Sequence, residues 1–417
     1  MSESALSTTS TSVLKTVFSL PVIVAALGYF VDIYDLVLFS IVRVPSLKSL
    51  GLAGQELIDK GVFLLNMQMA GMLIGGIIWG VLGDKKGRLK IMFGSIFLYS
   101  VANLANGMVS SLPAYAALRF IAGIGLAGEL GAGITLVSEV LHKSVRGYGT
   151  MMVASVGVSG AILANFVAKS FEWRNAFLIG GILGLLLLIM RVSVSESGMF
   201  RQMKERPVST GNFLALFTDA GRFTRFAHSI LIGVPTWFVV GILITFSPEF
   251  AKALGTTGRV TAGNAVMFCY LGLVLGDLAS GMLSQFLRSR KKVVFIFLAL
   301  TLLGVAAYFL QGSVSPQVFY GICAFLGFGS GYWAIFVTIA AEQFGTNLRA
   351  TVATTVPNFV RGMVVPITLL FQAVRQQLGL ERGAIAVGIV CLVVALYSLY
   401  RLDETFFKDL DYFEEFL

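Results

Sequence analysis

Charged residues are scarce in this chain of 417 residues, of which only 13% are charged and 56% are hydrophobic. The mean hydropathy is +0.85. A soluble protein of this length needs a more highly charged surface. Each membrane-spanning helix uses ~20 mostly apolar residues, so twelve would use roughly 240. The composition therefore excludes an ordinary soluble protein and indicates a polytopic membrane protein.

Cysteine and histidine are also rare. The three cysteines, Cys269, Cys323 and Cys391, each lie inside an apolar run, and the two histidines are His142 and His228. Their spacing matches neither a disulfide framework nor a metal site. The sequence also shows no pairing of a nucleophile with a base. We therefore predict no metal, no cofactor and no enzymatic activity.

Acidic residues number 22 against 31 basic ones, which gives a net charge of +9. The basic residues gather in the loops after predicted spans 2, 4, 8 and 10, whereas the short loops after spans 3 and 9 contain no Lys or Arg. Cytoplasmic loops carry such an excess. The pattern predicts that both termini are cytoplasmic and argues against nucleic-acid binding. We expect a monomeric, multi-pass protein of the bacterial inner membrane.

The apolar runs predict twelve spans, at about 17–42, 61–82, 91–110, 114–138, 148–169, 174–194, 226–247, 261–284, 293–312, 317–341, 354–374 and 384–401. One long polar segment divides them into two sets of six. The predicted domains are an N-terminal six-helix bundle (1–194), a cytoplasmic linker (195–225), a C-terminal six-helix bundle (226–402) and a cytoplasmic tail (403–417).

The loop between spans 2 and 3 is Gly80-Val-Leu-Gly-Asp-Lys-Lys-Gly-Arg-Leu-Lys90. Gly80 and Gly87 allow close backbone approach and a tight turn. Asp84 is placed to cap the following helix, where free N–H groups favour a negative charge. This loop, which also contains Arg88, resembles the signature loop of major facilitator superfamily transporters.

An internal repeat supports the resemblance. Glu139-x6-Arg146 after span 4 recurs as Glu342-x6-Arg349 after span 10. Two six-span repeats of like orientation match the parallel halves of this superfamily. The predicted fold is an all-α membrane protein with twelve transmembrane helices in two pseudo-symmetric six-helix bundles.

Further fragments resemble the sugar porters and their metabolite:proton symporter relatives, namely Arg119-x3-Gly123-x-Gly125 in span 4 and Glu404-Thr405 in the tail. The resemblance implies a secondary transporter that works by alternating access. It also implies a cytoplasmic gate that closes and opens between states, although helix capping and topology would explain the same residues. The gate residues would be Gly80, Asp84, Gly87, Arg88, Glu139, Arg146, Glu342 and Arg349.

Four ionisable residues fall inside spans 1 and 4, namely Asp32, Asp35, Arg119 and Glu129. Such side chains are costly there and usually have a partner or a role. Asp32 and Asp35 are three residues apart in span 1, so they share a helix face. With a rise of ~1.5 Å per residue, Arg119 lies at the depth of Asp32. We expect the two carboxylates to exchange Arg119 as their partner during transport. We also expect one of them to carry a proton, because two close carboxylates resist double ionisation. A static Asp–Arg pair is the alternative.

Glu129 falls near the middle of the bilayer and corresponds, through the repeat, to Tyr332. It is a candidate both for proton coupling and for substrate binding; a local ion pair with Lys169 or Arg119 is the alternative. Tyr332 and Trp237 lie on spans 10 and 7, which line the cavity in the resembled fold. Packing would explain these aromatic residues equally well.

Arg361 and Asn358 lie one turn apart in span 11. Arginine presents a planar fork that suits a carboxylate, so both residues are candidates for substrate binding. Arg361 lies ~10 Å from the inner end of the predicted span, which leaves snorkelling to the cytoplasm as an alternative.

These features together predict proton-coupled transport of a small organic acid. The partners would be the solute, protons and the lipid bilayer. The alternatives are a neutral sugar or polyol, a cationic amine, or a nutrient sensor that does not transport, and the direction of transport stays open.

Overall fold

The computed structural model describes residues 18–86, 88–129, 152–153, 156–195, 213–408 and 414, and all secondary structure in these ranges is helical. Nine helices of this part are long and apolar enough to span a membrane. Three shorter apolar helices, Ile91–Asn106, Leu112–Leu126 and Val156–Ser170, occupy the places of predicted spans 3, 4 and 5. The prediction of a twelve-helix membrane protein is confirmed.

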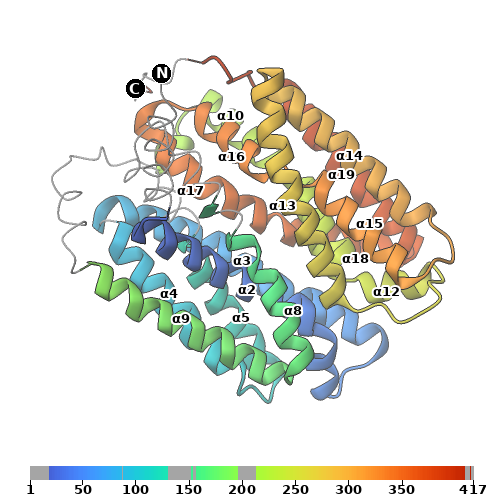
Figure 1. Ribbon diagram of the computed structural model, residues 1–417. Helices are drawn as coiled ribbons and strands as arrows, with labels where there is room; N and C mark the ends of the chain where they lie inside the picture. Colours follow the sequence, from blue (N-terminus) through green and yellow to red (C-terminus); the bar gives the residue numbers. More distant parts are fainter. Residues whose placement is uncertain are drawn as a thin grey trace, which may run out of the picture.

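The first six spans form one group of helices. They are α2 (Leu20–Ser49), α3 (Gly54–Lys86), α4 (Arg88–Asn106), α5 (Leu112–Leu126), α8 (Gly160–Ser170) and α9 (Trp173–Ser195). Within the group, α3 packs on α5, α4 packs on α5 and α9, and α2 packs on α8 and α9. These helices lie side by side in blue to green in Figure 1.

The last six spans form the second group, in yellow-green to red in Figure 1. They comprise α10 (Ala220–Leu231), α11 (Val234–Phe238), a π-helical segment (Val239–Ile244), α12 (Ser247–Ala253), α13 (Ala262–Leu287), α14 (Arg290–Leu310), α15 (Pro316–Gly329), α16 (Trp333–Glu342), α17 (Thr346–Gly362), α18 (Val364–Leu378) and α19 (Leu380–Arg401). A 3₁₀ turn, η1 (Phe213–Leu216), precedes them. Helix α10 begins inside the stretch predicted as a linker, and the domain boundaries stay a prediction.

Spans 7, 10 and 11 each contain two α-helices with a short interruption between them. The apolar runs of the sequence did not predict these interruptions. Span 7 breaks between α10 and α11, span 10 between α15 and α16, and span 11 between α17 and α18. Pro235 stands in the first turn of α11, where its missing N–H is tolerated. Irregular backbone at membrane depth is tolerated only inside protein or beside a water-filled path. The breaks therefore mark the interior of the second half.

The crossing of α13 and α15 brings two backbones into contact. A Cβ atom on Gly327 would clash with the carbonyl oxygen of Cys269, and one on Gly272 would clash with that of Ala324. Glycine is needed at both positions because backbone atoms cannot move aside as a flexible side chain can.

Gly327→Ala is therefore expected to destabilise the protein by about 1–3 kcal/mol or more, because the two helices must separate. The midpoint of thermal unfolding of the purified protein measures the loss. Gly321→Ala is the matched control on the same helix, since nothing lies within 4 Å of a Cβ there. Equal losses in both variants would contradict the explanation.

The two halves meet along α3, which packs on α17 and α18, and along α13, which packs on α2 and α8. Several polar contacts join them at the end of the bundle that carries the α2–α3 connection, which we call the distal end. Arg43 pairs with Glu249 at 2.6 Å, and Thr245 donates to Ser40 at 3.0 Å. The halves are further joined there by Asp59–Arg375, Asn66–Thr368 and Asn165–Asn264. The distal end is thus closed in this structure.

Candidate functional site

Asp32 and Arg361 face each other across the contact between the halves. Nη2 of Arg361, on α17, lies 3.7 Å from Oδ2 of Asp32, on α2, and their side chains are 1% and 0% exposed. Neither carboxylate oxygen has a hydrogen-bond partner among the described residues, and the same holds for Nε and Nη1 of Arg361. The two charges attract each other, while both oxygens of Asp32 and two nitrogens of Arg361 keep their hydrogen-bonding capacity unused. The site can therefore take up a proton, a ligand oxygen, or both.

The position of Arg361 corrects the predicted depth. Helix α17 begins at Thr346 rather than near residue 354, so Arg361 lies ~22 Å along it. Snorkelling is wrong, since the side chain is enclosed by protein. The apolar run predicted too short a helix because the first turns of α17 are rich in threonine. Two of these threonines, Thr351 and Thr355, are buried. Helices that face protein rather than lipid tolerate such residues.

Asp35 faces a different part of the molecule from Asp32. A Cβ on Gly180 of α9 would clash with Oδ1 of Asp35, so this carboxylate lies against α9 inside the first half. Side chains three residues apart on a helix point about 60° away from each other. Where both sides of a helix are buried, that angle is enough to give the two acids separate surroundings.

Arg119 also lies inside the first half. Its guanidinium stands 5.4 Å from the ring of Phe39 and 5.3 Å from that of Phe177, and its three nitrogens have no hydrogen-bond partner in the described part of the chain. The predicted pairing of Asp32 with Arg119 is absent here, because Asp32 faces Arg361 instead. Exchange of Arg119 between the acids stays a prediction.

Glu129 is held by a partner that the sequence analysis missed. Arg191 of α9 binds it with two hydrogen bonds, of 3.1 and 2.8 Å, and the Ser95 hydroxyl donates a third of 2.8 Å. Neither Lys169 nor Arg119 is the partner. Arg191 lies within the apolar run of predicted span 6, and its charge there was the signal that could have pointed to this pair. The pair touches α2 one turn from Asp32, since a Cβ on Gly28 would clash with Nη2 of Arg191.

The candidate residues of the second half fall into two groups. Tyr332 donates its hydroxyl to the carbonyl of Ile232 at 2.9 Å, and Asn358 donates to the carbonyl of Ala127 at 3.0 Å. Both side chains therefore already donate a hydrogen bond to a backbone carbonyl group. The Trp237 ring lies edge-on to Trp333 at 6.4 Å, and the Arg361 guanidinium lies 5.9 Å from the Trp333 ring. Trp237 is thereby brought near the Asp32–Arg361 pair.

The predicted cytoplasmic gate is visible only in part. Glu342 accepts two hydrogen bonds from Arg290, of 2.6 and 2.8 Å, and Gly80 lies beside Thr355 of α17. The remaining candidates, Asp84, Gly87, Arg88, Glu139, Arg146 and Arg349, lie outside the described residues or side chains, so the gate stays a prediction. No group of three His, Cys, Asp or Glu side chains in the described ranges could hold a metal ion.

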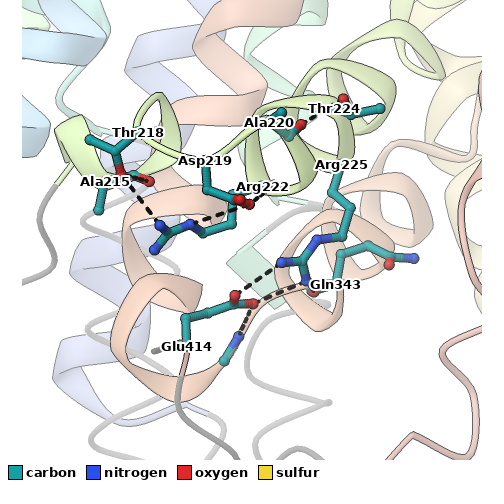
Figure 2. Close-up of polar contacts among 10 residues, drawn as sticks. Ala215, Thr218, Asp219, Ala220, Arg222, Thr224, Arg225, Gln343 and Glu414 are labelled. Atoms are coloured by element: carbon teal, nitrogen blue, oxygen red, sulfur yellow. Dashed lines mark hydrogen bonds and ion pairs between the residues drawn. The ribbon is translucent and has the colours of Figure 1, made fainter. Parts of the chain in front are cut away.

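The C-terminal tail is fastened to the second half beside this gate. Arg225 of α10 binds both carboxylate oxygens of Glu414, at 3.0 and 2.9 Å, and donates to the carbonyl of Gln343 at 2.8 Å (Figure 2). Glu404 accepts from the Ser289 hydroxyl and from the backbone N–H groups of Arg290 and Lys291. It therefore caps α14, where the helix dipole favours a negative charge.

Glu404→Gln is expected to lower the midpoint of thermal unfolding by about 1–3 °C at neutral pH. Burial raises the pKa of Glu404, but the hydroxyl and backbone donors outweigh it and hold the pKa below its usual value. A lowered pKa stabilises the fold above the ordinary glutamate pKa of about 4.3, and this contribution is lost on acidification. Thermal scans at pH 7 and pH 4 should thus differ less in the variant than in the native protein; an unchanged difference would contradict the cap.

Comparison with known proteins gives consistent matches. The sequence profile of the Major Facilitator Superfamily matches residues 25–365. The niacin transporter NiaP of Acinetobacter baylyi is 26% identical over 93% of this chain and 94% of its own length. The gentisate transporter of Corynebacterium glutamicum is 27% identical over 90% of this chain and 86% of its own. The solved structure of the proton:xylose symporter XylE is 16% identical, with a TM-score of 0.71 over 95% of this chain and 98% of that one, and so shares the fold.

Proposed function

The chain belongs to the Major Facilitator Superfamily, and from this premise we propose that it moves a small organic acid together with protons by alternating access. It is a membrane transporter rather than an enzyme. Two transporters similar to it are named for niacin and gentisate, which are both carboxylic acids. The proposal extends that chemistry to this chain.

The observation that carries the proposal is the Asp32–Arg361 pair at the contact between the halves. An ionised Asp32 attracts Arg361 and competes with any other carboxylate for it. A proton on Asp32 removes that competition and frees the guanidinium fork for the carboxylate of the solute. Proton and organic anion then bind together, and neither leaves an uncompensated charge in the interior. This linkage is symport.

Alternating access requires the contacts at the distal end to break in the opposite state. Two rigid halves that rock about a midplane site would separate Arg43 from Glu249 and Arg375 from Asp59. With the termini in the cytoplasm of a bacterium, this structure is closed to the outside.

A cationic amine fits the same interior less well. The charge of Asp32 is offset by Arg361 and that of Glu129 by Arg191. Among the candidate acids of the described ranges, Asp35 alone makes no ion pair. An amine would therefore have to displace an arginine that already lies within the protein.

Asp32→Asn is expected to abolish accumulation of a carboxylate driven by a pH gradient while exchange of solute across the membrane remains measurable. The amide keeps the shape of the side chain but cannot bind and release the proton. Uptake from a mixed metabolite pool into proteoliposomes, with and without the gradient, measures both the solute and the coupling.

Asp35→Asn is the matched variant on the same helix. If only this variant loses coupling, Asp35 is the proton carrier instead. If both variants keep full pH-driven uptake, proton coupling through span 1 is refuted. Accumulation of sugars or amines in place of acids would refute the proposed solute class.

A further inference from the structure

Two tryptophan side chains of the second half lie beside the Arg361 guanidinium. The ring of Trp333, on α16, lies 5.9 Å from it, and the ring of Trp237, on α11, meets that of Trp333 edge-on at 6.4 Å. The cation therefore stands at the edge of an aromatic wall that α11 and α16 build.

Trp237 has an unused hydrogen-bond donor beside this wall. The residue is 5% exposed, and its Nε1 has no partner in the described ranges. An indole nitrogen can only donate, and a buried donor without a partner is destabilising. Tyr332, by contrast, has satisfied its hydroxyl with a backbone carbonyl. An acceptor brought by a solute would satisfy the donor of Trp237.

We propose that the site selects aromatic carboxylic acids whose ring carries a hydrogen-bond acceptor. The carboxylate binds Arg361, the ring packs on Trp333, and the acceptor receives the Nε1–H of Trp237. This inference rests on the proposed function, since it specifies which organic acids the same site takes.

Each part of the solute contributes separately to its affinity. A ring stacked on or set edge-on to an indole gains more than its buried area alone provides, by about two- to tenfold in affinity. A single hydrogen bond adds a similar factor of about two to ten. A saturated ring of the same size, such as cyclohexanecarboxylate, keeps the carboxylate and the bulk but loses the aromatic gain.

The test is titration calorimetry on the purified protein with cyclohexanecarboxylate, benzoate and the three monohydroxybenzoates. Benzoate is expected to bind about three- to tenfold more tightly than cyclohexanecarboxylate, and the best hydroxybenzoate about three- to tenfold more tightly than benzoate. Trp237→Phe should remove only the gain from the hydroxyl, and Trp333→Leu the preference for benzoate. The thermal midpoint of each variant shows whether it is folded.

Three outcomes would overturn the inference. Equal binding of benzoate and cyclohexanecarboxylate would exclude the aromatic wall while leaving an organic acid as the solute. A hydroxyl gain that survives Trp237→Phe would exclude that residue as the donor. If none of the five acids binds to the folded native protein, the proposed function fails together with the inference.

Discussion

Arg361→Ala is expected to weaken binding of a carboxylate by about a hundredfold or more. Arginine offers a carboxylate two charge-assisted hydrogen bonds, each contributing about 1.5–3 kcal/mol. The loss of two such bonds corresponds to at least two factors of ten in the dissociation constant. Calorimetric titration of benzoate into the native protein and the variant measures the change directly.

Two further variants separate binding from folding. Arg361→Lys keeps the charge but loses the planar fork, so it should bind carboxylates with intermediate affinity. Arg361→Ala also leaves Asp32 as an unpaired charge in the interior; adding Asp32→Asn should therefore restore the thermal midpoint without restoring carboxylate binding. An equal loss of binding for neutral solutes and carboxylates in Arg361→Ala would show that the residue only supports the fold.

The fold was predictable because it follows from local properties of the chain. Runs of about twenty apolar residues have few structures available to them other than a membrane helix. The repeat of Glu139 and Arg146 as Glu342 and Arg349 then indicated two parallel halves. Interruptions such as Ser330–Tyr332 escaped prediction because apolar and small residues continue through them, and only packing against other helices decides where the backbone turns.

The pairing of the buried charges was harder to predict than their presence. Each of Asp32, Asp35, Arg119, Glu129 and Arg361 stands out as an ionisable residue inside an apolar run. Their partners depend on helix rotation and on contacts between distant spans, which periodicity does not contain. Depth alone matched Asp32 with Arg119, whereas the closest cation to Asp32 comes from α17 in the other half. Arg191 was overlooked because it lies close to the end of its run, where a snorkelling side chain would be unremarkable.

Arg191→Ala is expected to destabilise the protein by about 3–5 kcal/mol, because it leaves the Glu129 carboxylate buried and unpaired. Glu129 is 2% exposed, and the Ser95 hydroxyl alone cannot replace a cation that donates two hydrogen bonds. The measurement is the thermal midpoint of the purified protein together with the yield of monodisperse material. Arg382→Ala is the control, since this arginine of α19 is exposed and its replacement should change the free energy of unfolding by no more than about 0.5 kcal/mol.

The double variant Glu129→Gln with Arg191→Met removes both charges and should recover most of the loss. If it recovers stability but not pH-driven uptake, Glu129 acts in transport as well as in packing; if it recovers both, the pair only supports the first half. No loss of stability in Arg191→Ala would mean that the two side chains do not form this buried pair in the membrane.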